Sequence, residues 1–138
     1  MSRYPGVRFV LISPEELKLP RYVKEQYIKA KNIPYTQSTD LETVMPELDI
    51  LYMTRVQRER FTDIMEYERV KNYYTLKASM LEGARPNMRI LHPLPRVGEI
   101  DRDVDDNPHA YYFEQARNGL YARQAIICRA LGINPADI

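Results

Sequence analysis

The sequence is poor in cysteine and has no long apolar run. Cys128 is the sole cysteine among 138 residues, so no disulfide can form within the chain, and we expect a reducing, cytoplasmic environment. No segment approaches the roughly 20 consecutive apolar residues that a membrane-spanning helix needs, and the first residues lack the basic and then apolar pattern of a signal peptide. We therefore expect a protein without a membrane partner.

A strong charge of one sign is also missing. Lysine and arginine number 20 against 19 aspartates and glutamates, which gives a formal net charge of +1. This balance disfavours a nucleic-acid partner, because proteins that bind nucleic acids usually carry a strong positive field. A chain of 138 residues is long enough for one hydrophobic core, so we expect a single domain.

Metal and nucleotide motifs are absent as well. The two histidines, His92 and His109, have no cysteine or acidic ligand at the spacing of a zinc site. The sequence contains neither a glycine-rich dinucleotide fingerprint nor a P-loop, and it has no G-x-S-x-G nucleophile motif. We expect neither a metal nor a cofactor.

What the sequence does contain is an alternation of short apolar runs and helical patterns. Runs typical of buried strands occupy residues 8–13, 48–53 and 88–91. Helical patterns lie at residues 20–31, behind a capping box at 39–42, and at 63–72, 76–81 and 113–131, and a short extended piece is expected at residues 34–37. The alternation predicts an α/β, Rossmann-like fold with a mainly parallel sheet and helices on both faces, and we expect the last helix to lie across the sheet.

Polar side chains follow the strand at residues 48–53. Arg55 offers a charged fork and Gln57 an amide that donates and accepts hydrogen bonds, a pair that suits an amino acid or a dicarboxylate. Ligands in parallel α/β folds bind beyond the carboxyl ends of strands, where this pair is expected. The alternative is a structural Arg55 that is neutralised by Glu59 or Asp49.

The strand at residues 88–91 leads into the sequence HPLPR at 92–96. Pro93 and Pro95 each remove a backbone donor and fix φ, so the Leu94 carbonyl should be held rigidly without a ladder partner. The alternative is a tight turn with a purely structural role.

In the last helix, Arg123 shares the face of the apolar stripe. Its charge must therefore be paired, as in a buried ion pair, or reach a ligand. Gly119 in the same helix suggests a close approach by another backbone.

Three segments carry a resemblance to a known family: DILYMTRVQRERF at 49–61, MRILHPLPRVGEIDRDVD at 88–105 and PHAYYFEQARNGLYARQA at 108–125. They resemble the aspartate-binding half of aspartate carbamoyltransferase catalytic chains, and the match runs from about Arg8 to Leu131. It implies that residues 1–138 are an Asp/Orn-binding domain. The implied reaction is attack by the L-aspartate amine on carbamoyl phosphate, which yields N-carbamoyl-L-aspartate and phosphate in pyrimidine synthesis.

The resemblance also implies roles for the residues at the strand ends. Arg55 would clamp an aspartate carboxylate, and Gln57 would orient the same substrate. A cis Leu94-Pro95 bond would present the Leu94 carbonyl to the attacking amine. Pro93 stands where the sister ornithine enzymes have cysteine, and this proline together with the pair of Arg55 and Gln57 implies a substrate with a second carboxylate.

Four further residues match supporting positions of the family. Glu59 is similar to a residue that pairs with and positions the arginine at the first strand end. The other three match positions around the crevice, namely Arg96, Glu99 and Arg123.

The resemblance has departures. The family's carbamoyl-phosphate half is missing, as are the first strand and helix of the aspartate half, so we expect the chain alone to be inactive. Carbamoyl phosphate would be a partner only when the other half is present. Intact relatives are expected to be homotrimers, with or without regulatory chains. The alternative is a non-catalytic amino-acid-binding or assembly module on the same fold.

Overall fold

Four short strands form two parallel pairs. The computed structural model describes residues 1–134, apart from the side chain of Arg60. β1 (Phe9–Ile12) pairs with β2 (Tyr35–Ser38), and β3 (Ile50–Tyr52) pairs with β4 (Arg89–Leu91). The predicted α/β class with parallel strands is confirmed. Among the described residues, however, no strand bridges the two pairs, so the continuous sheet is replaced by two small ones.

The connection between β1 and β2 is helical, as predicted for residues 20–31. α1 (Arg21–Val23) continues as a π-helix over Lys24–Ile28 and a 3₁₀ turn over Lys29–Lys31. Asn32 ends the segment with φ 51°, in the left-handed region that asparagine tolerates. Parallel strands need such a crossover, and this one returns the chain to the starting edge of β1.

The central helices are shorter than the patterns predict. α2 (Ile64–Val70) begins at Asp63, whose carboxylate accepts the Met65 N–H at 2.8 Å. The remaining short helices are 3₁₀ turns, at Glu15–Leu17, Met45–Glu47, Arg58–Arg60, Ala78–Leu81 and Arg102–Val104.

Two helix predictions were wrong at their starts. The capping box at 39–42 does not open a helix; Asp40 instead closes a turn by accepting the Glu42 N–H at 2.9 Å. The helix predicted at residues 76–81 begins only at Ala78, because Leu76 is extended and forms a parallel bridge with Ile100. That bridge consumes the backbone groups that a first helical turn would have used.

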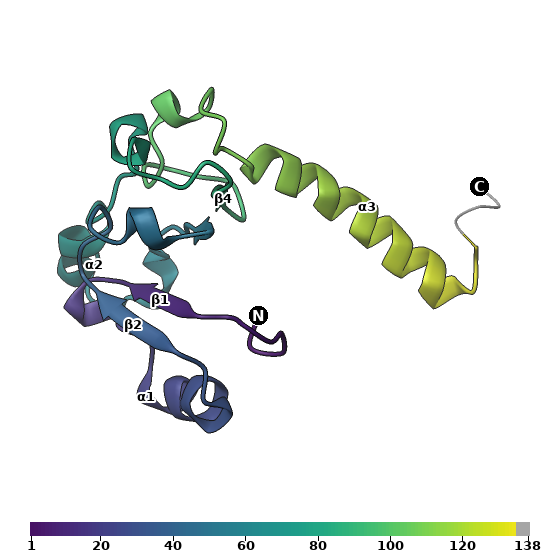
Figure 1. Ribbon diagram of the computed structural model, residues 1–138, viewed down its shortest axis with the longest axis horizontal. Helices are drawn as coiled ribbons and strands as arrows, with labels where there is room; N and C mark the ends of the chain where they lie inside the picture. The colour runs from purple at the N-terminus through teal and green to yellow at the C-terminus, as the bar shows by residue number, and fades with distance from the viewer. Residues whose placement is uncertain (135–138) are drawn as a thin grey trace.

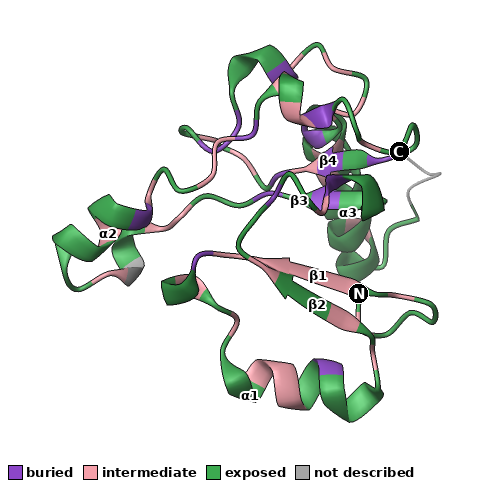
Figure 2. Cartoon of the chain, turned by 60° about the vertical axis from the view of Figure 1, so that its left-hand side comes forward, coloured by how far each residue is buried: buried purple, intermediate pink, exposed green. Residues whose placement is uncertain are grey.

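The core lies around β3 and β4. Figure 2 shows the buried residues concentrated there and in the adjoining segments, whereas β1 and β2 are only partly covered. Val10 and Ile12 of β1 still pack against this core. The fully buried side chains are those of Met45, Leu76, Met88, Ile90, His92, Val104 and Tyr112.

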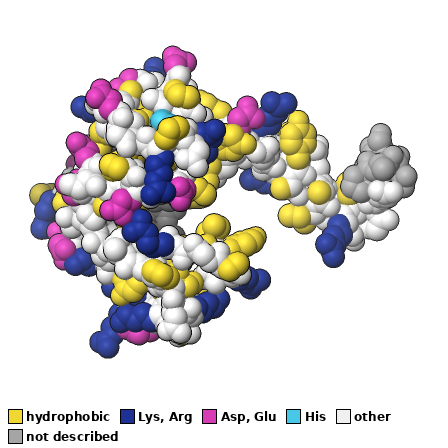
Figure 3. All heavy atoms as spheres, in the orientation of Figure 1, with side chains coloured by type: hydrophobic (Ala, Val, Ile, Leu, Met, Phe, Trp, Pro, Cys, Tyr) yellow, Lys and Arg dark blue, Asp and Glu magenta, His cyan; other side chains and the backbone are white. Residues whose placement is uncertain are grey.

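The long helix α3 (Tyr112–Leu131) projects away from the body of the molecule (Figure 1), so the expectation that it lies across the sheet was wrong. Its first turn is anchored, because Tyr112 is buried and the Tyr111 N–H bonds the Ile90 carbonyl at 3.0 Å. Beyond that turn its apolar side chains are exposed, as Figure 3 shows. More than half of the surface is accessible at Phe113, Leu120, Ile127 and Leu131.

The exposure of α3 also corrects the expectations for Arg123 and Gly119. Arg123 is exposed and has no ion-pair partner in the described part of the chain, so the buried ion pair, one of the two alternatives for this residue, is not formed. A β-carbon at Gly119 would meet only the Arg123 guanidinium, at 3.2 Å, and no other backbone. None of the described helices combines the length and the apolar character needed to cross a membrane.

Because the core is buried and α3 is exposed, the same substitution of isoleucine by alanine should affect the free energy of unfolding very differently at the two places. Ile90→Ala should lower the free energy of unfolding by about 2–5 kcal/mol, because Ile90 is fully buried and a cavity would remain. Ile127→Ala should change it by less than about 0.5 kcal/mol, because Ile127 is 58% exposed. Urea titrations of the two variants and the parent chain measure both values. Equal losses would contradict the exposed position of α3.

Candidate functional site

The two strand ends that carry the predicted site residues leave the same edge of one sheet. Leu51 pairs with Ile90 and Tyr52 with Leu91, and the Met53 N–H extends the ladder by bonding the Leu91 carbonyl at 2.9 Å. Neighbouring strands lie about 4.8 Å apart, so the segments after β3 and β4 start side by side. This edge holds the carboxyl ends of parallel strands, where ligands bind in α/β folds.

At the β3 end, Arg55 is held by an acidic neighbour. Its Nη2 donates to Glu59 Oε1 at 3.0 Å, and 41% of the Arg55 side chain is exposed. The pairing with Glu59 is therefore confirmed, while Asp49, the other candidate, accepts from Arg85 at 2.8 Å. An exposed ion pair contributes only about 0–1 kcal/mol, so the guanidinium remains available to a stronger anionic partner.

Gln57 lies two residues beyond Arg55 in extended backbone and is half-buried. In the described part of the chain, no hydrogen bond or ion pair joins Arg55 or Gln57 to the segment at 92–96. The structure thus brings the two segments to one edge of the sheet without a direct bond between them. Their roles in binding remain predictions.

At the β4 end, the Leu94-Pro95 peptide is cis, as the resemblance implies. Leu94 itself has φ 46°, in the left-handed region that bulky residues rarely occupy. Its side chain packs against the core, and its N–H donates to Nδ1 of His92 at 2.8 Å. Both the side chain and the backbone N–H of Leu94 therefore hold the turn in place.

His92 occupies a position that the sequence analysis missed. It is buried, and its Nε2 lies 2.6 Å from Oε1 of Glu99. Because Nδ1 accepts the Leu94 N–H, a neutral ring carries its proton on Nε2 and donates it to Glu99. The His92 backbone N–H donates in turn to Gln115 of α3 at 2.8 Å. The spacing of two residues between His92 and Leu94 was the signal that could have indicated their hydrogen bond. The contacts with Glu99 and Gln115 could not be predicted in this way, because only the fold brings these residues near His92.

Glu99 is buried and charged. Burial of its carboxyl acts to raise the pKa, but hydrogen bonds from the backbone of Gly98, Glu99 and Val97 and from His92 outweigh it, so the pKa of Glu99 is lowered. The Val97 and Gly98 N–H groups reach Oε2 at 3.1 and 3.0 Å. Glu99 thus links His92 to the backbone of residues 97 and 98, and its supporting role at the site stays a prediction.

Arg96 belongs to a second network beside the turn. Both of its terminal nitrogens donate to the carboxylate of Asp105, and Nη1 also donates to the Tyr112 hydroxyl at 3.2 Å. The bond from Arg96 holds the pKa of Asp105 low, and burial together with the Asp105 hydrogen bond raises the pKa of Tyr112 to about 12. Arg96 therefore ties the turn to the start of α3, and its guanidinium is already engaged.

Arg123 stands apart from this arrangement. It is eleven positions beyond Tyr112, which corresponds to about 16 Å along the helix at the usual rise. α3 projects away from the body of the molecule (Figure 1). Within the described residues, Arg123 does not join the groups that follow β3 and β4.

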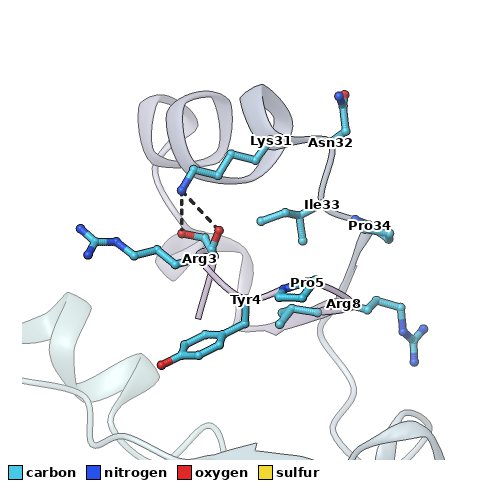
Figure 4. A pocket seen from close by; sticks show the side chains of 11 residues that line it. Arg3, Tyr4, Pro5, Arg8, Lys31, Asn32, Ile33 and Pro34 are labelled. Atoms are coloured by element: carbon cyan, nitrogen blue, oxygen red, sulfur yellow. Dashed lines mark hydrogen bonds between the residues drawn. The ribbon is translucent and has the colours of Figure 1, made fainter.

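An open depression of about 500 Å³ lies elsewhere, lined by residues 2–8 and 31–34. Figure 4 shows Lys31 bridging to Ser2, whose carbonyl and hydroxyl oxygens it reaches at 3.3 and 3.4 Å. The depression adjoins the starting ends of β1 and β2, opposite to the edge where α/β folds bind ligands. It includes none of the predicted site residues. Among the described residues, no cluster of three or more His, Cys, Asp or Glu side chains is arranged to hold a metal ion.

Comparisons with known proteins agree on one family. Residues 1–130 match the sequence model described as "Aspartate/ornithine carbamoyltransferase, Asp/Orn binding domain". The aspartate carbamoyltransferase catalytic subunit of Bacteroides fragilis is 66% identical over 137 residues, which are 99% of this chain and 44% of that protein. The corresponding subunit of Vibrio campbellii is 54% identical over 131 residues, covering 95% of this chain and 42% of the relative. The chain thus spans less than half the length of these curated relatives.

Solved structures show the same likeness. The catalytic subunit of M. jannaschii aspartate transcarbamoylase superimposes with a TM-score of 0.82 at 44% identity, covering 93% of this chain and 42% of that one. The Trypanosoma cruzi aspartate transcarbamoylase in complex with N-(phosphonacetyl)-L-aspartic acid has a TM-score of 0.75 at 34% identity, with 87% and 39% covered. Their similarity extends over almost all the described residues.

The lowered pKa of Glu99 predicts a loss of stability in acid. The carboxylate stabilises the fold fully above its ordinary pKa of 4.5, and this contribution disappears as the pH falls through the lower folded value. Glu99→Gln should lower the free energy of unfolding at pH 7 by about 1.5–3 kcal/mol, the range for hydrogen bonds to a charged group. The free energy of unfolding of this variant should also change less with pH between pH 5 and 3, because the amide does not titrate.

Urea titrations at a series of pH values measure this effect. Asp106→Asn is the matched control, because Asp106 is exposed and should leave both the stability at pH 7 and its pH dependence unchanged. An equal acid sensitivity in Glu99→Gln and the parent would contradict the assignment. Asp105 and Glu25, whose pKa values are also lowered, remain titratable in Glu99→Gln and in the parent and contribute to the remaining pH dependence.

Proposed function

Because this chain belongs to the aspartate/ornithine carbamoyltransferase family, we propose that it forms the aspartate-binding part of an aspartate carbamoyltransferase. The observation that carries this proposal is the pairing of β3 with β4, which sends Arg55 and the Leu94 turn out from one sheet edge. The names of the relatives at 53–66% identity support aspartate as the amino-acid substrate.

Aspartate is favoured over ornithine by the chemistry at the two strand ends. The Arg55 guanidinium matches a carboxylate with two parallel hydrogen bonds, and it is held only by an exposed pair with Glu59. Pro93 replaces the cysteine of the ornithine enzymes, which removes a thiol from the site. In this proposal Arg55 clamps a substrate carboxylate and Gln57 orients the same molecule.

The proposed reaction needs a nucleophilic amine and a carbamoyl donor. The neutral amine nitrogen of aspartate forms a bond to the carbamoyl carbon, the bond from that carbon to the phosphate oxygen breaks, and the departing phosphate takes up the proton that the amine loses. The Leu94 carbonyl accepts a hydrogen bond from the amine and aims its lone pair at the carbon. Catalysis then comes from positioning and from stabilising the developing charge, without a covalent intermediate on the protein.

The carbamoyl phosphate site belongs to the part of the relatives that this chain does not span. The chain covers 44% of the Bacteroides fragilis subunit, and its own phosphate-binding loop is not evident in the sequence. We propose that the remaining part must be supplied for turnover. Assembly into a trimer, with or without regulatory chains, is likewise proposed for the whole protein only.

Replacement of the matched segment in a relative tests this function. A chimaera in which this chain replaces the matched 137 residues of the Bacteroides fragilis subunit should form carbamoyl aspartate, whereas the isolated chain should form none. Turnover is measured as carbamoyl aspartate formed per active subunit, with the intact subunit as the positive control. A folded but inactive chimaera would favour the non-catalytic module, and turnover by the isolated chain would contradict the need for a second part.

Arg55→Ala in the same chimaera tests the carboxylate clamp. Loss of a hydrogen-bonded charge is usually worth about 1.5–3 kcal/mol, so kcat/KM for aspartate should fall about 10- to 150-fold. Arg55→Lys should recover only part of the loss, because lysine keeps the charge and lacks the fork. Arg69→Ala, at an exposed arginine of α2, should stay within about twofold of the parent. Equal effects of Arg55→Ala and Arg69→Ala would rule out the clamp.

A further inference from the structure

We propose that His92 is a positioning residue that aims the Leu94 carbonyl at the attacking amine. The inference rests on the proposed function, and it concerns a residue that neither contacts the substrate nor holds a metal. Its basis is the pair of hydrogen bonds that the His92 ring makes, one with the Leu94 N–H inside the turn and one with Glu99 just beyond it.

The His92 ring is unavailable for acid–base chemistry at the sheet edge. Its side chain is only 1% exposed, and both ring nitrogens are engaged, Nδ1 by the Leu94 N–H at 2.8 Å and Nε2 by Glu99 at 2.6 Å. A proton donor or acceptor for a substrate needs a nitrogen that reaches it within hydrogen-bond distance. The ring therefore acts through the groups that it binds.

One of those groups fixes the backbone of Leu94. The Leu94 N–H lies three residues beyond the end of β4 and donates to Nδ1 of His92 in place of a ladder partner. Leu94 also has φ 46°, a conformation that a leucine holds only when its surroundings impose it. With the N–H direction and φ fixed, the carbonyl carbon of Leu94 is placed, and the following Pro95 restricts ψ, the angle that sets the direction of the carbonyl oxygen.

The other group holds the ring in place. Glu99 accepts from Nε2 with one oxygen and from the Val97 and Gly98 N–H groups with the other, at 3.1 and 3.0 Å. Glu99 thereby sets both the tautomer and the plane of the ring. The His92 backbone is fixed independently by Gln115 at 2.8 Å. The His92 ring thus connects Glu99 to the backbone of Leu94 through one hydrogen bond on each ring nitrogen.

Variants of the active chimaera separate positioning from general stability. His92→Ala removes the acceptor for the Leu94 N–H, so kcat should fall about 10- to 100-fold, while KM for aspartate should change less than about threefold because Arg55 still binds the carboxylate. His92→Asn restores an acceptor, since asparagine side chains bond the N–H two residues on. It should return kcat to within about fivefold of the parent, although it cannot reach Glu99.

Amide hydrogen exchange at Leu94 supplies a readout that does not depend on turnover. The Leu94 N–H should be protected in the parent and in His92→Asn and unprotected in His92→Ala. Equal kcat losses in folded His92→Ala and His92→Asn proteins, or a KM that rises in step with the loss of kcat, would overturn the positioning role. If His92→Ala does not fold, a folded His92→Asn with kcat within fivefold supports the proposal, and a loss beyond about a hundredfold rejects it.

The failures of the two proposals are distinguishable. A folded parent chimaera without activity rejects the proposed function together with this inference. An active parent that loses activity in Arg55→Ala, but keeps it fully in His92→Ala, rejects only the role of His92.

Discussion

The parallel pairing of β3 with β4 is the constraint on which the rest of the structure depends. Three residue pairs set its register, and the bond from Met53 to Leu91 carries the ladder to the point where both strands end. A shift by one residue would turn Ile90 out of the core and move the Leu94 turn relative to Arg55. The same contacts that bury the apolar side chains thus determine which polar groups meet at the edge.

Two carboxylates hold the groups around the turn at 92–96 in place, one of them buried (Glu99) and the other partly buried (Asp105). Glu99 and Asp105 each accept several hydrogen bonds, from His92 and two backbone amides in one case and from Arg96 and Tyr112 in the other. Removing one partner of such a network leaves the other buried without compensation, which is more costly than the bonds are favourable. The role proposed for the Leu94 carbonyl requires such support, because the direction of a backbone carbonyl is set only by the conformation of the chain around it.

Local sequence determined part of this arrangement. The strand pattern located β1, β3 and β4 to within a few residues, and the spacing of four between Arg55 and Glu59 was enough to suggest their pairing. The extended state of Leu76 could not be read locally, because its bridge partner lies at Ile100. The hydrogen bonds of His92 were missed for the same reason, since its partners at 99 and 115 converge only after folding. Periodicity in α3 indicated an apolar face without indicating what covers it.

The attachment of α3 by its first turn divides the chain into regions of unequal cooperativity. Tyr112 and Gln115 connect that turn to β4 and His92, whereas the residues from Leu120 onward have few tertiary contacts to share in unfolding. Helices with little packing depend on their intrinsic propensity, which is marginal at this length in water. The distal turns of α3 therefore melt through local opening, at a free energy well below that of global denaturation, while the strand pair and the turn behind it remain intact.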